Sequence, residues 1–116
     1  MSLERMLDTL VRLGLTLTEA QAYVFLAKNG PHKGKELANT LRITKQQLYR
    51  SLRRLRAKGM VKATSQRPAQ FSAVSLEKVL ELSMKATIEK AKALQASRKE
   101  LLSTWRSMIE KESNNQ

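Results

Sequence analysis

The sequence of 116 residues has no cysteine, one histidine, two prolines and four glycines. The lack of cysteine excludes a disulfide framework and a thiolate metal site. His32 alone is too little for a histidine metal cluster or a histidine-dependent catalytic triad, and beside Pro31 we expect it to lie in a surface loop. We therefore predict no metal site and no cofactor.

Long apolar runs are also missing. No stretch approaches the roughly 18 residues of a membrane span, and no signal-peptide pattern opens the chain. No nucleophile–base pair or glycine-rich phosphate loop is visible, because Gly30 and Gly34 lack the required spacing. We expect a protein that does not enter membranes, that works in the cytoplasm in association with the nucleoid, and that is not an enzyme.

Acidic residues are scarce in one part of the chain. The formal charge is +12, from 22 basic and 10 acidic residues. Residues 1–30 carry three of each sign and residues 71–116 carry eight cations against six anions, whereas residues 31–70 carry eleven cations against Glu36 alone. Such a concentration of positive charge is typical of nucleic-acid binding, so double-stranded DNA is the expected partner.

The order of elements indicates the fold. Hydrophobic periodicity and turn residues predict helices that begin at the capping residues Ser2, Thr18, Thr44 and Ser75, with a further helix over 35–41. A short extended piece is expected at His32-Lys33, before the helix over 35–41, and two short strands are expected over 60–64 and 70–74. This order defines a winged helix-turn-helix. We predict a mainly α fold with a small β-hairpin wing: a DNA-binding domain over 1–75, and a long C-terminal dimerisation helix over 76–116.

The helix expected over 44–58 has two different faces. Leu48, Leu52 and Leu55 fall within roughly one 60° arc, and Gln46 and Arg50 point away from it. Arginine reads guanine edges, glutamine reads adenine edges, and other cations contact phosphates. A basic face is often merely solvated, but here the wing would extend the same surface, which favours a DNA contact. From the residues we expect base contacts from Gln46, Arg50 and Arg53, and phosphate contacts from Lys33, Lys35, Lys45, Arg54 and Arg67, with Gln66 at the wing tip.

The helix expected over 76–112 carries an apolar stripe with a seven-residue repeat. Such a stripe is typical of a coiled-coil seam and needs cover. The stripe could instead fold back on the helix at 2–13, and both arrangements hold if the first helix of one subunit packs on the tail of the other. We predict a homodimer whose interface contains Leu80, Met84, Thr87, Ile88, Ala91, Leu94, Leu101, Trp105 and Met108.

Several motifs together resemble one family of regulators. The matches are Leu13-Gly14-Leu15, the run from Leu17 to Leu26, Asn29-Gly30-Pro31, Lys35-Glu36-Leu37-Ala38 and Lys58-Gly59-Met60-Val61. They resemble the TrmB-type winged-helix regulators that are common in archaea. The resemblance implies sequence-specific DNA binding and places contacts on Thr44, Lys45, Gln46, Gln47, Tyr49, Arg50, Arg53 and Arg67. We find no counterpart of the sugar-sensing domain of full-length members in these residues, so the resemblance carries over no small-molecule effector, and the effector stays unknown.

The sequence is compatible with more than one function. The leading hypothesis is a dimeric DNA-binding transcription regulator. An architectural or chromatin protein with little sequence preference has the same charge pattern. A protein–protein adapter would not need the cationic helix face, and enzymatic activity finds no support in the residues.

Overall fold

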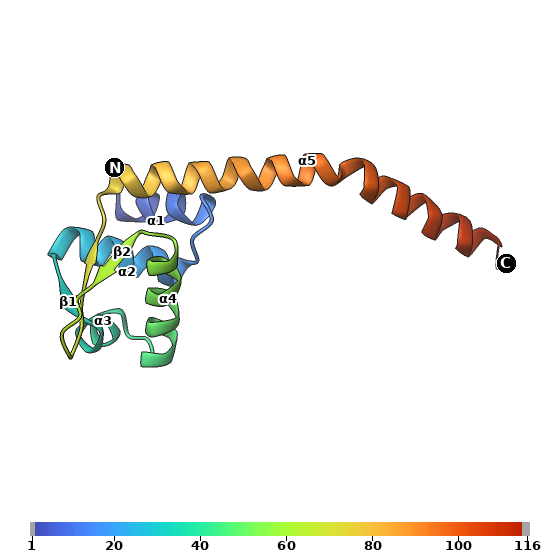
Figure 1. Ribbon diagram of the computed structural model, residues 1–116. Helices are drawn as coiled ribbons and strands as arrows, with labels where there is room; N and C mark the ends of the chain where they lie inside the picture. Colours follow the sequence, from blue (N-terminus) through green and yellow to red (C-terminus); the bar gives the residue numbers. More distant parts are fainter. Residues whose placement is uncertain (1, 115–116) are drawn as a thin grey trace. The chain divides into compact units, whose positions relative to one another are not determined.

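The computed structural model describes residues 2–114 (Figure 1). Along the chain its elements are α1 (Leu3–Arg12), α2 (Leu17–Asn29), β1 (His32–Lys33), α3 (Gly34–Leu41), α4 (Lys45–Ala57), β2 (Val61–Ala63), β3 (Gln70–Ala73) and α5 (Leu76–Asn114). The chain forms two compact units, one up to Met84 and the other from Lys85. The boundary falls inside α5, because Val79 and Ser83 are buried in the first unit.

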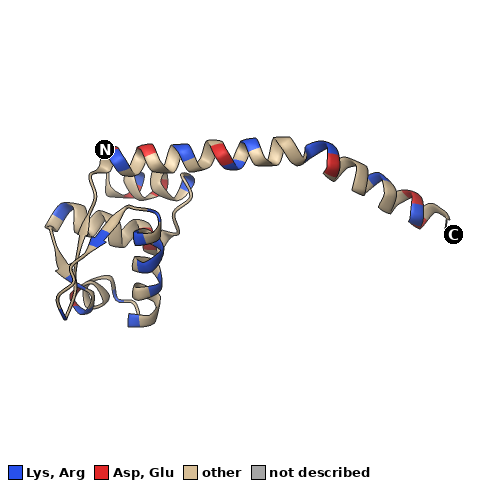
Figure 2. Cartoon of the chain, in the orientation of Figure 1, with Lys and Arg blue, Asp and Glu red and all other residues tan. Residues whose placement is uncertain are grey.

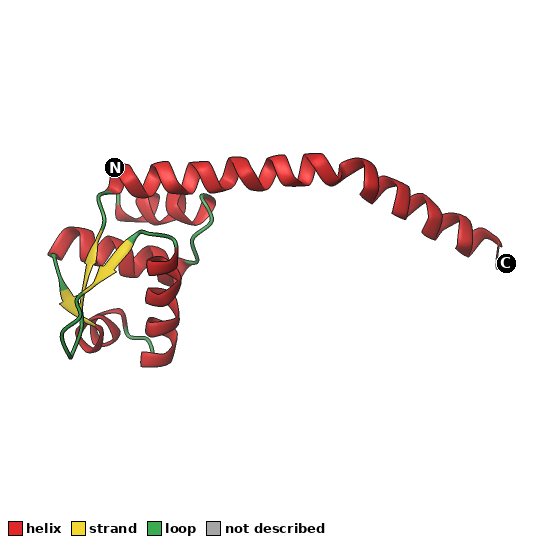
Figure 3. Cartoon of the chain, viewed as in Figure 1, coloured by secondary structure: helices red, strands yellow, loops and turns green. Residues whose placement is uncertain are grey.

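The winged helix-turn-helix is confirmed, but the expected two-stranded hairpin is part of a larger sheet. Three antiparallel strands lie in the order β1-β3-β2 (Figure 3). His32 of β1 lies opposite Phe71 of β3, and Val61 of β2 lies opposite Ala73. The extended segment before α3 therefore supplies the third strand, which ties the wing to the helices.

The start of α2 differs from the sequence prediction. Thr16, two residues before Thr18, is the N-cap. Its hydroxyl accepts a hydrogen bond from the Glu19 amide at 3.1 Å, and the Glu19 carboxylate accepts one from the Thr16 amide at 2.9 Å. This reciprocal capping box satisfies two amide donors at once. Thr18 could also form a capping box, with Gln21 three residues later. Glu19, the partner of Thr16, pairs in addition with the ammonium of Lys58 at the end of α4.

The core of the first unit is formed by side chains from α1, α2, α3, α4, the sheet and the first turns of α5. The predicted stripe on α4 is confirmed, because Leu48, Leu52 and Leu55 are at most 1% exposed. Burial of one such side chain contributes about 1.5–3 kcal/mol. Tyr23 is also buried, and its hydroxyl donates to the carbonyl oxygen of Val74 at 2.7 Å. The buried leucines hold α4 by one face, and the Tyr23 hydrogen bond joins α2 to the segment that follows β3.

The long helix α5 begins as expected. The Ser75 hydroxyl accepts a hydrogen bond from the Lys78 amide at 3.3 Å. Leu80, expected in a dimer interface, is half-buried against the core of the first unit. No helix within residues 2–114 combines the length and apolar character needed to cross a membrane.

Candidate nucleic-acid interface

The N-terminus of α4 is held by its own side chains. The Thr44 hydroxyl accepts a hydrogen bond from the Gln47 amide at 3.1 Å, and the Gln47 side-chain oxygen accepts one from the Thr44 amide at 3.3 Å. Both residues were predicted to contact DNA. In the structure Thr44 and Gln47 together form the capping box of α4, which fixes the direction in which the helix begins.

The polar side of α4 is exposed along its length. Lys45, Gln46, Arg50, Arg53 and Arg54 are all exposed, opposite the buried leucines. Figure 2 shows basic residues repeated in blue along this helix. The helix therefore presents guanidinium and amide groups to solvent from a rigid base, as a recognition helix requires.

Most cations of the basic block are available to a ligand. Within residues 2–114, Lys58 is the one cation of 31–70 that has an ion pair. The other ten are exposed and have no carboxylate within 4.0 Å: Lys33, Lys35, Arg42, Lys45, Arg50, Arg53, Arg54, Arg56, Lys62 and Arg67. Their charge is not neutralised within the described chain, so phosphates of a duplex can neutralise it.

A groove of about 650 Å³ lies between α4 and the loop that joins β2 to β3. Arg53 and Arg56 line it from the helix, and Gln66 and Arg67 line it from the wing. The structure thus brings the predicted wing residues to the same groove as Arg53. Arg56 was not among the predicted contacts. Its spacing of three from Arg53 was a usable signal, but a helical wheel does not show which flank the wing approaches.

Tyr49 lies at the junction of three elements. Its ring meets Phe71 of β3 edge-on, with centroids 6.2 Å apart. A Cβ atom added to Gly34 of α3 would lie only 2.6 Å from Tyr49 Cζ, so the phenol occupies the space that this glycine leaves. Tyr49 is still 40% exposed and lines the groove. Tyr49 therefore joins α3, α4 and the sheet, and part of its ring stays exposed in the groove.

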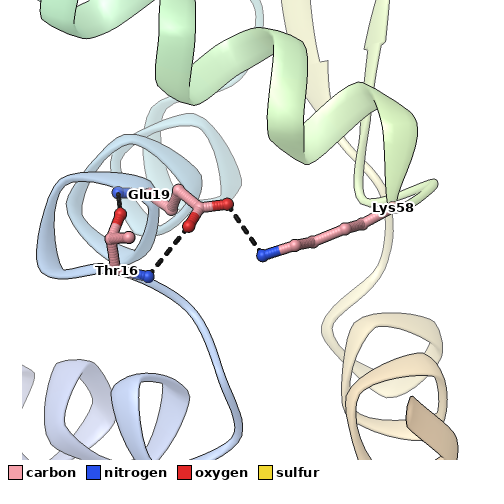
Figure 4. A network of polar contacts seen from close by, with 3 residues as sticks. All are labelled: Thr16, Glu19 and Lys58. Atoms are coloured by element: carbon pink, nitrogen blue, oxygen red, sulfur yellow. Dashed lines mark hydrogen bonds and ion pairs between the residues drawn. The ribbon is translucent and has the colours of Figure 1, made fainter.

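Lys58 at the end of α4 has a structural partner (Figure 4). Its ammonium lies 2.9 Å from Glu19 Oε2, and the Glu19 side chain is 1% exposed. Burial alone would raise the pKa of Glu19, but the hydrogen bonds from Thr16 and the ion pair with Lys58 outweigh burial and lower that pKa. Lys58 belongs to the basic block by sequence, yet it anchors the end of α4 to the start of α2.

Lys33 and Lys35 flank the start of α3. Both are exposed, and the Lys33 amide donates to the Glu36 carboxylate at 3.0 Å. Glu36, the one acid of the basic block, is thus engaged in capping α3. Neither lysine has an ion pair within the part of the chain that the structure describes.

The predicted dimer interface lies along α5, and most of its residues are on the helix surface. Leu94, Leu101, Trp105 and Met108 are each between 56% and 62% exposed. Met84, Thr87, Ile88 and Ala91 are exposed as well. Of the predicted interface set, only Leu80 packs on the first unit's core.

Together these features define a winged helix-turn-helix DNA-binding protein. The model of the family described as "Sugar-specific transcriptional regulator TrmB" matches residues 10–77. The chain belongs to this family of DNA-binding regulators, which are not enzymes. No curated protein gives a match to the chain.

Solved structures show the same fold. TrmBL2, an archaeal chromatin protein, is 27% identical, has a TM-score of 0.76 and matches 93% of this chain. This chain spans only 41% of the length of that one. The ST1889 protein from the archaeon Sulfolobus tokodaii is 24% identical over 80% of this chain and 98% of that one, with a TM-score of 0.64. The transcriptional regulator Tm0710 from Thermotoga maritima is 19% identical over 98% of this chain and 88% of that one, with a TM-score of 0.58.

Proposed function

We propose that this chain is a dimeric transcription regulator that reads duplex DNA with the recognition helix (44–58) and the wing (60–74). The observation that carries the proposal is the set of ten exposed cations without an ion pair in residues 31–70. Lys45, Arg50 and Arg54 lie on the exposed side of α4, and Arg53, Arg56 and Arg67 line the wing groove. Membership of the TrmB family supports it.

The residues divide into two roles. Gln46, Arg50 and Arg53 project from the middle of the exposed face and are proposed to contact base edges in the major groove. The surrounding cations are proposed to contact phosphates, which set affinity and register but not sequence. Those cations are Lys33, Lys35, Lys45, Arg54, Arg56 and Arg67.

Dimerisation is part of the proposal. The exposed apolar stripe of α5 would pair with a second copy, so that two modest DNA contacts act together through their effective concentration. We place the protein on DNA in the cytoplasm, associated with the nucleoid.

The test is selection of duplexes from a random pool, followed by competition at about 150 mM salt. A specific regulator should bind its selected site about 10³-fold or more tighter than random duplex. The variant Lys45→Ala/Arg54→Ala should lose affinity for all duplexes. Its matched control, Lys85→Ala/Lys92→Ala on α5, removes the same charge and should leave affinity nearly unchanged. Equal losses from both pairs would contradict the proposed face.

A second candidate function is an architectural protein that coats DNA with little sequence preference. The observation that favours it is the similarity to TrmBL2, an archaeal chromatin protein, over most of this chain. In that case the selection would enrich no motif, and competition by random duplex would equal competition by any selected sequence.

A further inference from the structure

The seam of α5 contains two charges in a symmetrical position. From Met84 to Glu112 the seven-residue repeat places nine residues on one face of the helix. Seven of them are uncharged, one is basic and one is acidic: Met84, Thr87, Ala91, Leu94, Arg98, Leu101, Trp105, Met108 and Glu112. Arg98 and Glu112 each lie seven residues from Trp105, on opposite sides of it.

The uncharged part of this seam is open to solvent. Leu94 is 62% exposed, Trp105 57% and Met108 56%. Arg98 and Glu112 are exposed too, and neither has a carboxylate or ammonium partner within 4.0 Å in the described part of the chain. A contiguous apolar face of this kind marks an interaction site.

The two charges distinguish the possible orientations of a pair of such helices. In a parallel pair each residue faces its own copy, so Arg98 would oppose Arg98 and Glu112 would oppose Glu112. In an antiparallel pair centred on Trp105, each Arg98 faces Glu112 of the other copy. Like charges that face each other at an interface repel, whereas opposite charges attract and fix the register.

We propose that α5 docks on α5 of a second copy in the antiparallel sense, with Trp105 at the two-fold axis and two symmetrical Arg98–Glu112 pairs. The inference rests on the proposed function, from which it takes the dimer. The neighbouring positions agree with it. In this register Leu102 lies within one residue of the level of Ile109 of the partner subunit, an apolar pair beside the seam.

The proposed register sets the distance between the two points at which the paired helices leave their winged units. Met84 and Trp105 are 21 residues apart, which corresponds to ~32 Å of helix at ~1.5 Å per residue. The two points at which the helices join their winged units would then be ~60 Å apart along the pair.

Disulfide cross-linking tests the orientation, because the chain has no native cysteine. Leu101→Cys and Met108→Cys chains are co-expressed with different tags and oxidised as full-length protein. Cα atoms must lie within about 4.4–6.8 Å for a disulfide. The antiparallel register places position 101 beside position 108 of the partner, whereas 101–101 and 108–108 are ~12 and ~9 Å apart along the axis.

The expected product is a mixed-tag disulfide dimer from the co-expressed chains, with little disulfide from either chain alone. Disulfide dimers of Leu101→Cys alone would show a parallel seam and overturn the inference. A monomer by sedimentation equilibrium would overturn both the inference and the dimer of the proposed function. Duplex binding by a parallel dimer would overturn the inference and leave the proposed function standing.

Charge reversal gives an independent readout on exposed residues. Arg98→Glu should raise the dimer dissociation constant roughly tenfold or more, because the introduced carboxylate would face Glu112 of the partner subunit. Arg98→Glu/Glu112→Arg should restore it to within about threefold of the original value. Circular dichroism checks that helix content is unchanged. No change on single reversal, or no recovery in the double variant, would overturn the pairing.

Discussion

The ammonium of Lys58 lies 2.9 Å from the buried carboxylate of Glu19 and joins the end of α4 to the start of α2. Glu19 also closes the capping box of Thr16. One carboxylate therefore fixes the first turn of α2 and the last turn of the recognition helix. Neither Glu19 nor Lys58 lines the groove between α4 and the wing.

Loss of the Lys58 ammonium should destabilise the first unit. Lys58→Met leaves the Glu19 carboxylate buried with only its Thr16 partners, so we expect a loss of about 1–3 kcal/mol in the free energy of unfolding. Urea unfolding measures it. The control Lys62→Met removes an exposed cation that has no ion pair and should cost within about 0.5 kcal/mol. Similar losses in the two variants would show that Glu19 does not depend on Lys58.

The same pair predicts a pH dependence of stability. The pKa of Glu19 is lowered below its ordinary value of 4.5, so the unfolded state binds more protons than the folded state as the pH falls below that value. Stability from this group is present above the ordinary pKa and is lost as the pH falls through the folded pKa. Between pH 5 and pH 3, Glu19→Gln should therefore lose less stability than the unaltered chain. Parallel curves in urea unfolding would contradict this.

Gly34 and Tyr49 should be energetically coupled. Alanine is favoured over glycine in a helix by about 0.5–1 kcal/mol, but a Cβ at Gly34 meets the Tyr49 ring, and overpacking costs about 1–3 kcal/mol. Gly34→Ala should therefore destabilise the chain with Tyr49 present and stabilise it in the Tyr49→Ala background. A double-mutant cycle by thermal unfolding measures the sign change. The same sign in both backgrounds would exclude the contact.

Arg50 and Lys35 should affect DNA binding in different ways. Arg50→Ala should cost about 1–3 kcal/mol at one base position of the selected site and relax the preference there. Lys35→Ala should weaken binding to all sequences alike and reduce the salt slope by about 1. Binding to single-base variants of the site, repeated at several salt concentrations, separates the two. An unchanged base preference after Arg50→Ala would refute the assigned readout.

Arg56 provides a test of the groove itself. Because it lines the groove between α4 and the wing, Arg56→Ala should reduce affinity and lower the salt slope by about 1. Lys28 on α2 lies outside this groove, so Lys28→Ala is the matched control. An equal effect of the two substitutions would show that the groove does not meet the duplex.

Local patterns were sufficient for most of the fold. The leucines of α4 recur on one side of a helix, and burial of that side follows from periodicity alone. Thr44 and Ser75 precede their helices as caps because side-chain oxygens satisfy amides within the next turn. The predicted cap of α2 was wrong by two residues, because Thr16 and Thr18 are both plausible caps locally. The contact that favours Thr16 is the ion pair between its capping partner Glu19 and Lys58, which is distant in sequence.

The basic block, the order of the elements and the polar face of α4 could all be inferred from sequence, because charge and periodicity are properties of neighbouring residues. Contacts between segments distant in sequence could not. The pairing of His32 with Phe71, the contact of Tyr49 with Gly34 and the ion pair of Lys58 with Glu19 each join residues far apart along the chain. Packing in three dimensions therefore decided which basic side chains share the wing groove and which one stabilises the fold.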